Sequence, residues 1–180
     1  MARHACVLLA LTLALPSGAF GQSDRYRPSE TVHEGEEVVA VVIGSSHCGF
    51  STWPVYMAVI DPMLRSLQSQ ARARGLGFAA IGVAADEPAD SGFAYLKRLA
   101  DFDEIITGRT WFNTGLLHYV WPDSTIVPAT PKLLLFARRF SDGVHSARMM
   151  TTRRLFVAEG TDSIMAFARR GAPLPALLPN

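Results

Sequence analysis

The strongest constraint on the fold is a run of six apolar residues, Val38 to Ile43, which ends at Gly44. Five of the six are β-branched, and none is polar. This pattern predicts a strand that is buried on both faces, as the strands of parallel sheets are. A second run of the same kind, from Phe78 to Ala84, predicts another buried strand. Between the two, apolar residues recur at helical spacing from Val59 to Ala71, which predicts a helix with one apolar face.

The rest of the chain continues to alternate between helical and strand patterns. Four more elements are expected: a helix near 93–100, a strand over 132–138, a hairpin strand over 144–150 after a turn at 141–143, and a helix from Thr161 or Asp162 to Arg170 that Gly171 ends. Pro54 and Pro62 are expected to start, kink or split the first helix. This order predicts an α/β fold with a mostly parallel sheet and helices on its faces.

The segment 101–128 has a weaker pattern. Ile105 and Ile106 are expected to form a short strand, and residues 111–120 an aromatic-rich helix. Trp111, Tyr119 and Trp121 could line a substrate groove, but aromatic residues at helical spacing more often belong to the core.

Residues 1–21 have the three parts of a secretory signal peptide: Arg3, an apolar run from Cys6 to Leu15, and small residues at Ala19 and Gly21. Cleavage is expected before Gln22, so the mature protein is predicted to be exported, either periplasmic or secreted. The apolar run is too short for a membrane anchor, and no membrane association is expected after the signal is removed. The expected parts of the chain are the signal peptide 1–21, a polar extended lead-in 22–37, one domain 38–171, and a loose Pro-rich tail 172–180.

Loss of the signal leaves Cys48 as the single cysteine, because Cys6 lies within the signal. The mature chain therefore cannot form an internal disulfide, and a lone thiol in an oxidising compartment either pairs with another molecule or stays free. Of the 17 basic residues the signal removes Arg3 alone, so 16 basic and 16 acidic residues remain. This balance gives no electrostatic argument for binding nucleic acid.

Cys48 follows the first strand in the polar segment 44–51 and is expected at the start of the helix. Unpaired backbone N–H groups and the dipole at a helix start stabilise a thiolate, which lowers the pKa of the thiol. His47 is expected to act in the same direction. A buried structural cysteine is the alternative, but the polar, Gly-containing surroundings favour a reactive thiol.

Two separate segments resemble the thioredoxin superfamily. Residues 38–51 form a strand followed by Cys-x-x-Ser, similar to the family's Cys-x-x-Cys with the second cysteine replaced. Residues 126–136 are similar to the family's loop and strand with a cis-proline. The resemblance implies a thioredoxin-like fold over most of 36–170, with a central mixed sheet flanked by helices. It also implies that Pro131 is the cis-proline and that Thr130 lies beside the incoming substrate chain. The long separation of Cys48 from Pro131 implies a helical insertion before the cis-proline strand, as in exported thioredoxin-like proteins.

The departures from the family pattern define the expected chemistry. Ser51 stands where the resolving cysteine would be, and Val42 stands near the position of the family's buried acid. Dithiol cycling within the chain is therefore excluded. What remains is a monothiol: Cys48 attacks a protein or small-molecule disulfide, and an external reductant thiol releases the mixed disulfide. The Ser51 hydroxyl can donate a hydrogen bond to the thiolate.

Two other functions remain open. The chain could be a non-catalytic binding or assembly module in which Cys48 is a relic or a tether. Cys48-Gly-Phe-Ser51 also spells the motif of monothiol glutaredoxins, which bind an iron–sulfur cluster with glutathione. The lysine before that motif and the glycine pair after the cis-proline strand are absent, however, so this resemblance is the weaker one.

No cofactor or metal is expected. The mature histidines lack metal-site spacing: His33, His47, His118 and His145. The sequence contains no P-loop, dinucleotide fingerprint or Gly-x-Ser-x-Gly elbow. Asp86, Glu87 and Asp90 are expected to form a solvated loop.

Overall fold

The computed structural model describes residues 35–141 and 148–176. The predicted signal peptide, nearly all of the lead-in and residues 142–147, which include most of the predicted turn at 141–143 and the start of the predicted hairpin strand, lie outside these ranges. None of the described helices is both long and apolar enough to cross a membrane.

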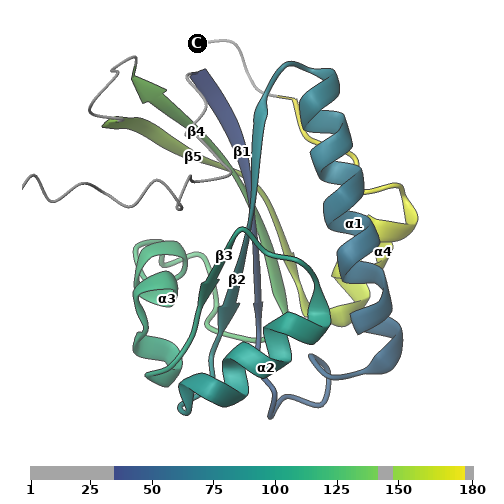
Figure 1. The fold of residues 1–180 in the computed structure, drawn as a ribbon, viewed down its shortest axis with the longest axis vertical. Helices are drawn as coiled ribbons and strands as arrows, with labels where there is room; N and C mark the ends of the chain where they lie inside the picture. The colour runs from purple at the N-terminus through teal and green to yellow at the C-terminus, as the bar shows by residue number, and fades with distance from the viewer. Residues whose placement is uncertain (1–34, 142–147, 177–180) are drawn as a thin grey trace, which may run out of the picture. The chain divides into compact units, whose positions relative to one another are not determined.

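Five strands form one mixed sheet in the order β3-β2-β1-β4-β5 (Figure 1). The central strand β1 (Gly35–Gly44) runs parallel to β2 (Gly77–Ala84) and antiparallel to β4 (Lys132–Ser141). At the two edges, β3 (Glu104–Ile106) is parallel to β2, and β5 (Arg148–Glu159) is antiparallel to β4. The hairpin strand is thus longer than predicted, and β1 begins three residues earlier, within the expected lead-in.

Strand β1 is buried on both faces, as its sequence predicts, because Val38 to Ile43 are at most 1% exposed. Its alternate side chains Val38, Ala40 and Val42 face three helices, and we call this side the α1 face of the sheet: α1 (Pro54–Ala73), α2 (Ala89–Leu99) and α4 (Gly160–Arg169). Val39, Val41 and Ile43 face the other side, where helix α3 (Thr114–Tyr119) packs.

Three helices cover the α1 face: α1 (Pro54–Ala73), α2 (Ala89–Leu99) and α4 (Gly160–Arg169). Helix α1 begins at Pro54 and continues through Pro62, so the second proline does not split it. A proline suits the first helical position because its fixed φ fits the helix and its missing N–H costs nothing there.

The predicted insertion before the cis-proline strand covers the opposite face. It contains the 3₁₀ helix η1 (Thr110–Phe112) and helix α3 (Thr114–Tyr119), which Asn113 separates and caps through a 2.9 Å hydrogen bond from Leu116 N. Tyr119 packs on Phe136 with the ring centroids 5.5 Å apart, whereas Trp121 remains 45% exposed. The two short helices therefore replace the single aromatic-rich helix predicted from the sequence.

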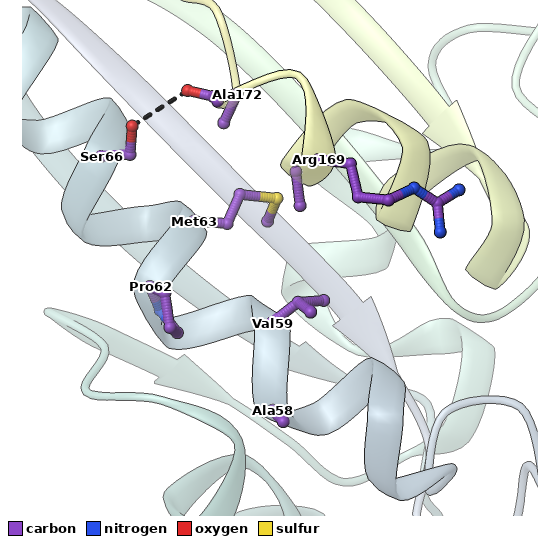
Figure 2. A pocket seen from close by; sticks show the side chains of 9 residues that line it. Ala58, Val59, Pro62, Met63, Ser66, Arg169 and Ala172 are labelled. Atoms are coloured by element: carbon purple, nitrogen blue, oxygen red, sulfur yellow. Dashed lines mark hydrogen bonds between the residues drawn. The ribbon is translucent and has the colours of Figure 1, made fainter.

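The prediction of a loose tail from residue 172 is wrong for the described part of the tail. Leu174 is only 4% exposed, and Gln70 of α1 bonds both to Ala172 O, at 2.9 Å, and to Leu174 N, at 2.9 Å. Figure 2 shows the groove between α1 and α4 that lies beside this contact; Ser66 Oγ donates to Gly171 O at its edge. The tail packs because the apolar side chain of Leu174, five residues beyond the last residue of α4 (Gly160–Arg169), reaches the core. This contact has no periodic signal in the sequence.

The strand order, the crossover helix between β1 and β2, and the antiparallel β4–β5 pair followed by a terminal helix make this a thioredoxin-like fold. The predicted fold class is confirmed.

Candidate functional site

Cys48 lies in a turn at the carboxyl end of β1, the edge of the sheet where α/β proteins usually bind ligands. The turn is closed by hydrogen bonds from Cys48 N to Ser45 O (3.2 Å) and from Thr52 N to Cys48 O (3.0 Å). The sequence placed Cys48 at the start of the helix, but α1 begins only at Pro54. Backbone amides of the turn, and not the end of the helix, therefore surround the sulfur.

The loop before β4 meets Cys48 from the other side. The Thr130–Pro131 peptide bond is cis. The thiol of Cys48 donates to Thr130 O across 3.5 Å, although the two residues are 82 positions apart in the chain. The resemblance implied this juxtaposition, and the structure brings the two segments together.

The surroundings of the half-buried sulfur favour its ionised form. Burial raises the pKa of the Cys48 thiol, but hydrogen bonds from the side chains of Thr130 and Ser51, and from the backbone of Ser51 and Phe50, outweigh burial, so that its pKa lies below the ordinary value. A hydrogen bond to a thiolate stabilises the charged form, which is why these donors lower the pKa.

Ser51 is fully buried, and its hydroxyl makes no hydrogen bond of ordinary geometry to the described residues. A buried unpaired hydroxyl is unfavourable. Ionisation of the neighbouring sulfur supplies an acceptor, so the Ser51 hydroxyl gains a partner when the thiolate forms.

Two buried tyrosines lie behind the turn. Tyr95 OH donates to Ser51 O at 3.3 Å. Burial is the main cause that raises the pKa of both Tyr95 and Tyr56, so both remain neutral hydroxyls. Gly44 makes room for this arrangement, since a Cβ atom there would lie 2.2 Å from Tyr95 OH. No sequence pattern pointed to these tyrosines. Gly44, a glycine that ends a buried strand, is the signal that could have suggested a side chain packed closely against the backbone there.

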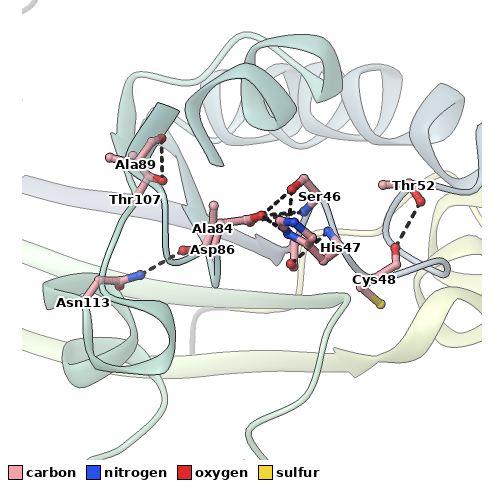
Figure 3. A network of polar contacts seen from close by, with 10 residues as sticks. Ser46, His47, Cys48, Thr52, Ala84, Asp86, Ala89, Thr107 and Asn113 are labelled. Atoms are coloured by element: carbon pink, nitrogen blue, oxygen red, sulfur yellow. Dashed lines mark hydrogen bonds and ion pairs between the residues drawn. The ribbon is translucent and has the colours of Figure 1, made fainter. Parts of the chain in front are cut away.

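A network of polar contacts anchors the residues just before Cys48 (Figure 3). Ser46 N donates to both carboxylate oxygens of Asp86 at 3.1 Å, and Ser46 Oγ donates to the same carboxylate. The prediction that Asp86 is solvated is therefore wrong, because Asp86 is 1% exposed; Glu87 and Asp90 are exposed, as expected. The reason is topological: β1 and β2 are parallel, so the residues that follow each strand meet at one edge of the sheet.

His47 belongs to this network. Its Nδ1 lies 3.0 Å from Asp86 Oδ1, and its side chain is 73% exposed. Figure 3 shows the ring turned toward Asp86, with the sulfur of Cys48 on the other side of the turn. His47 was expected to lower the pKa of the Cys48 thiol, but the groups that lower it in the structure are the hydroxyls of Thr130 and Ser51 and the backbone amides of Ser51 and Phe50.

The start of α4 is tied to the cis-peptide loop. Gly160 N donates to Pro131 O at 2.9 Å, and the fully buried Lys132 forms an ion pair with Glu159. These contacts hold the first turn of α4 close to the loop that contacts Cys48.

In residues 35–141 and 148–176 no group of three or more His, Cys, Asp or Glu side chains is placed to hold a metal ion. The chemistry that these residues can supply is that of one accessible thiol with a stabilised thiolate.

No protein-family model and no curated protein matches the chain. Among solved structures, it is similar to a thioredoxin-family thiol:disulfide interchange protein from Chlorobium tepidum TLS, with 11% identity, a TM-score of 0.37, and coverage of 76% of this chain and 81% of that one. It is also similar to BsSco, a member of the Sco family of cytochrome c oxidase assembly proteins, with 15% identity, a TM-score of 0.34, and coverage of 76% and 80%.

Proposed function

We propose that this protein, after export, carries out thiol–disulfide exchange as a monothiol, with Cys48 as the nucleophile. The observation that carries the proposal is the half-buried sulfur of Cys48, which faces Thr130 O and has a lowered pKa. The thiolate is the attacking form of a cysteine, so an environment that favours it favours the exchange.

The proposed reaction has two steps. The Cys48 thiolate attacks one sulfur of a substrate disulfide; the Cys48–sulfur bond forms, the substrate S–S bond breaks, and the other substrate sulfur leaves as a thiolate that water protonates. An external thiol, ionised to its thiolate, then attacks the substrate sulfur of the mixed disulfide, and Cys48 leaves as a thiolate. The external thiol ends as a disulfide with the first substrate sulfur, so electrons balance without a second cysteine in the chain.

The test is to trap partners in the compartment where the protein resides. Wild type is expected to yield reducible covalent complexes that Cys48→Ser does not form. Purified wild type is also expected to reduce a model disulfide in the presence of excess external thiol, over many turnovers. If complexes form but no turnover occurs, the protein is a binding or assembly module tethered through Cys48; if neither occurs, Cys48 has no redox role.

A further inference from the structure

A groove of about 490 Å³ lies next to Cys48. One wall is the Cys48 turn, and the other is the first turn of α4. The lining residues are Gly49, Phe50, Trp53, Thr161 and Asp162. The hydrogen bond from Gly160 N to Pro131 O, 2.9 Å long, holds the start of α4 beside the cis-peptide loop that contacts Cys48. The groove is therefore close enough to Cys48 to contact a chain bonded to its sulfur.

Two aromatic side chains in the groove are left open to solvent. Phe50 is 68% exposed and Trp53 is 42% exposed. Exposed rings of this size at the rim of a reactive site are typical of a binding surface. Their faces can also attract a cation, most strongly over tryptophan.

The groove has one sign of charge. Of the described residues that line it, only Asp162 is charged, and Asp162 is exposed at the first turn of α4. The neighbouring Glu159 is already paired with Lys132. A carboxylate beside two open aromatic rings matches the chemistry of an arginine or lysine side chain, whose apolar stem packs on a ring while its cationic head meets the carboxylate.

We propose that the groove selects disulfides of protein segments that carry an arginine or lysine close to the reacting cysteine. This inference rests on the proposed exchange through Cys48 and adds the substrate class. Anionic disulfides, including glutathione disulfide, are disfavoured because the described lining of the groove offers them a carboxylate and no cation.

The experiment uses the full chain with Cys6→Ser, so that Cys48 is the single thiol. Short peptides with one cysteine, activated as a 2-pyridyl disulfide, carry arginine, glutamine or glutamate on both sides of the cysteine. Release of pyridine-2-thione reports the rate of mixed-disulfide formation. We expect the arginine peptide to react about tenfold faster than the glutamate peptide, with the glutamine peptide between them.

The variant Asp162→Asn is expected to abolish most of this preference, and Asp162→Lys to reverse it. Trp53→Ala is expected to slow the arginine peptide more than the glutamate peptide. The matched control is Asp90→Asn, which changes an exposed acid in the first turn of α2, outside the groove. Each variant is compared by the ratio of two peptide rates, measured on protein shown by circular dichroism to be folded, because unfolded chain would react with every peptide through Cys48.

Reaction with the small neutral 2,2′-dithiodipyridine separates the two proposals. Equal rates for all three peptides, with normal reaction of the small disulfide, would overturn the groove inference and leave the exchange function standing. No reaction of Cys48 with any of the disulfides would overturn both.

Discussion

The Sγ atom of Cys48 lies 3.5 Å from the carbonyl oxygen of Thr130. The first residue belongs to the turn after β1, and the second to the loop before β4. The contact brings the two segments that resemble thioredoxins into one site, and it depends on the turn being held in place.

Ser51→Ala should destabilise the thiolate of Cys48, and so raise its pKa, with little change in the stability of the fold. The hydroxyl lowers the pKa of Cys48, and it makes no hydrogen bond of ordinary geometry to the described residues. Its removal is expected to raise the midpoint of Cys48 alkylation and to slow alkylation at neutral pH about fivefold, the effect of ~1 kcal/mol. The free energy of unfolding should change by less than about 1 kcal/mol. A large loss of stability with unchanged alkylation would show that the hydroxyl is structural.

Asp86→Ala should destabilise the turn that precedes Cys48. The substitution removes the acceptor of Ser46 N and Ser46 Oγ and leaves these donors without their partner. We expect the free energy of unfolding in urea to fall by about 2–3 kcal/mol. Asp86→Asn keeps one carbonyl oxygen as acceptor and should cost less.

The control for Asp86 is Glu87→Ala, one residue further along and exposed. Its effect should stay within about 0.5 kcal/mol. Equal effects at the two positions would contradict the anchoring role of Asp86.

Two glycines in this part of the chain should respond differently to alanine. In Gly44→Ala the new Cβ would lie 2.2 Å from the hydroxyl of Tyr95, a fully buried ring that has no room to move. We expect the free energy of unfolding to fall by about 3 kcal/mol or more. In Gly49→Ala the Cβ meets nothing within 4 Å, so stability should hardly change. Thermal unfolding of both variants checks this pair.

The two partners of the buried ion pair beside the cis-peptide loop should differ in how much their replacement lowers the free energy of unfolding. Lys132 is fully buried, while the side chain of Glu159 is 41% exposed. Glu159→Gln leaves a buried ammonium group without its anionic partner and is expected to cost about 2–3 kcal/mol. Lys132→Met replaces the charge by an apolar chain of similar volume and should cost less, because the freed carboxylate can be solvated. Urea unfolding that ranks the two variants in the opposite order would contradict this account.

Stability should depend on pH through Cys48. Its pKa is lowered in the folded protein, so the folded state releases the thiol proton more readily than the unfolded chain. This contribution is present above the unfolded pKa and is lost as pH falls through the folded pKa. The unfolding free energy of the Cys6→Ser protein, measured relative to its Cys48→Ser variant, should therefore rise from neutral to mildly alkaline pH. A flat or falling difference would contradict it.

The sequence predicted the parts of the fold that have a simple pattern. The two apolar runs at 38–43 and 78–84 identified the parallel pair, because burial on both faces leaves no polar position. The proximity of Cys48 to the Thr130–Pro131 loop was implied only by the resemblance of residues 38–51 and 126–136 to the thioredoxin superfamily.

The residues that support the site have no such pattern. In the sequence, Asp86 cannot be told apart from any other acidic residue in a polar loop. Only the parallel pairing of β1 with β2 places its carboxylate within hydrogen-bond distance of Ser46. Tyr95 occupies one apolar position of a helix among several, and its contact with Ser51 O depends on how α2 packs. The burial of Leu174 likewise depends on a tertiary contact with α1.

The most direct test of the central claim is the pH dependence of Cys48 alkylation in the Cys6→Ser chain, measured once for the folded protein and once for the same protein unfolded in urea. The hydroxyls of Thr130 and Ser51 and the amides of the turn stabilise the thiolate only when the chain is folded. The midpoint is therefore expected at lower pH in the folded protein. A folded midpoint equal to or above the unfolded one would show that the site does not activate its cysteine.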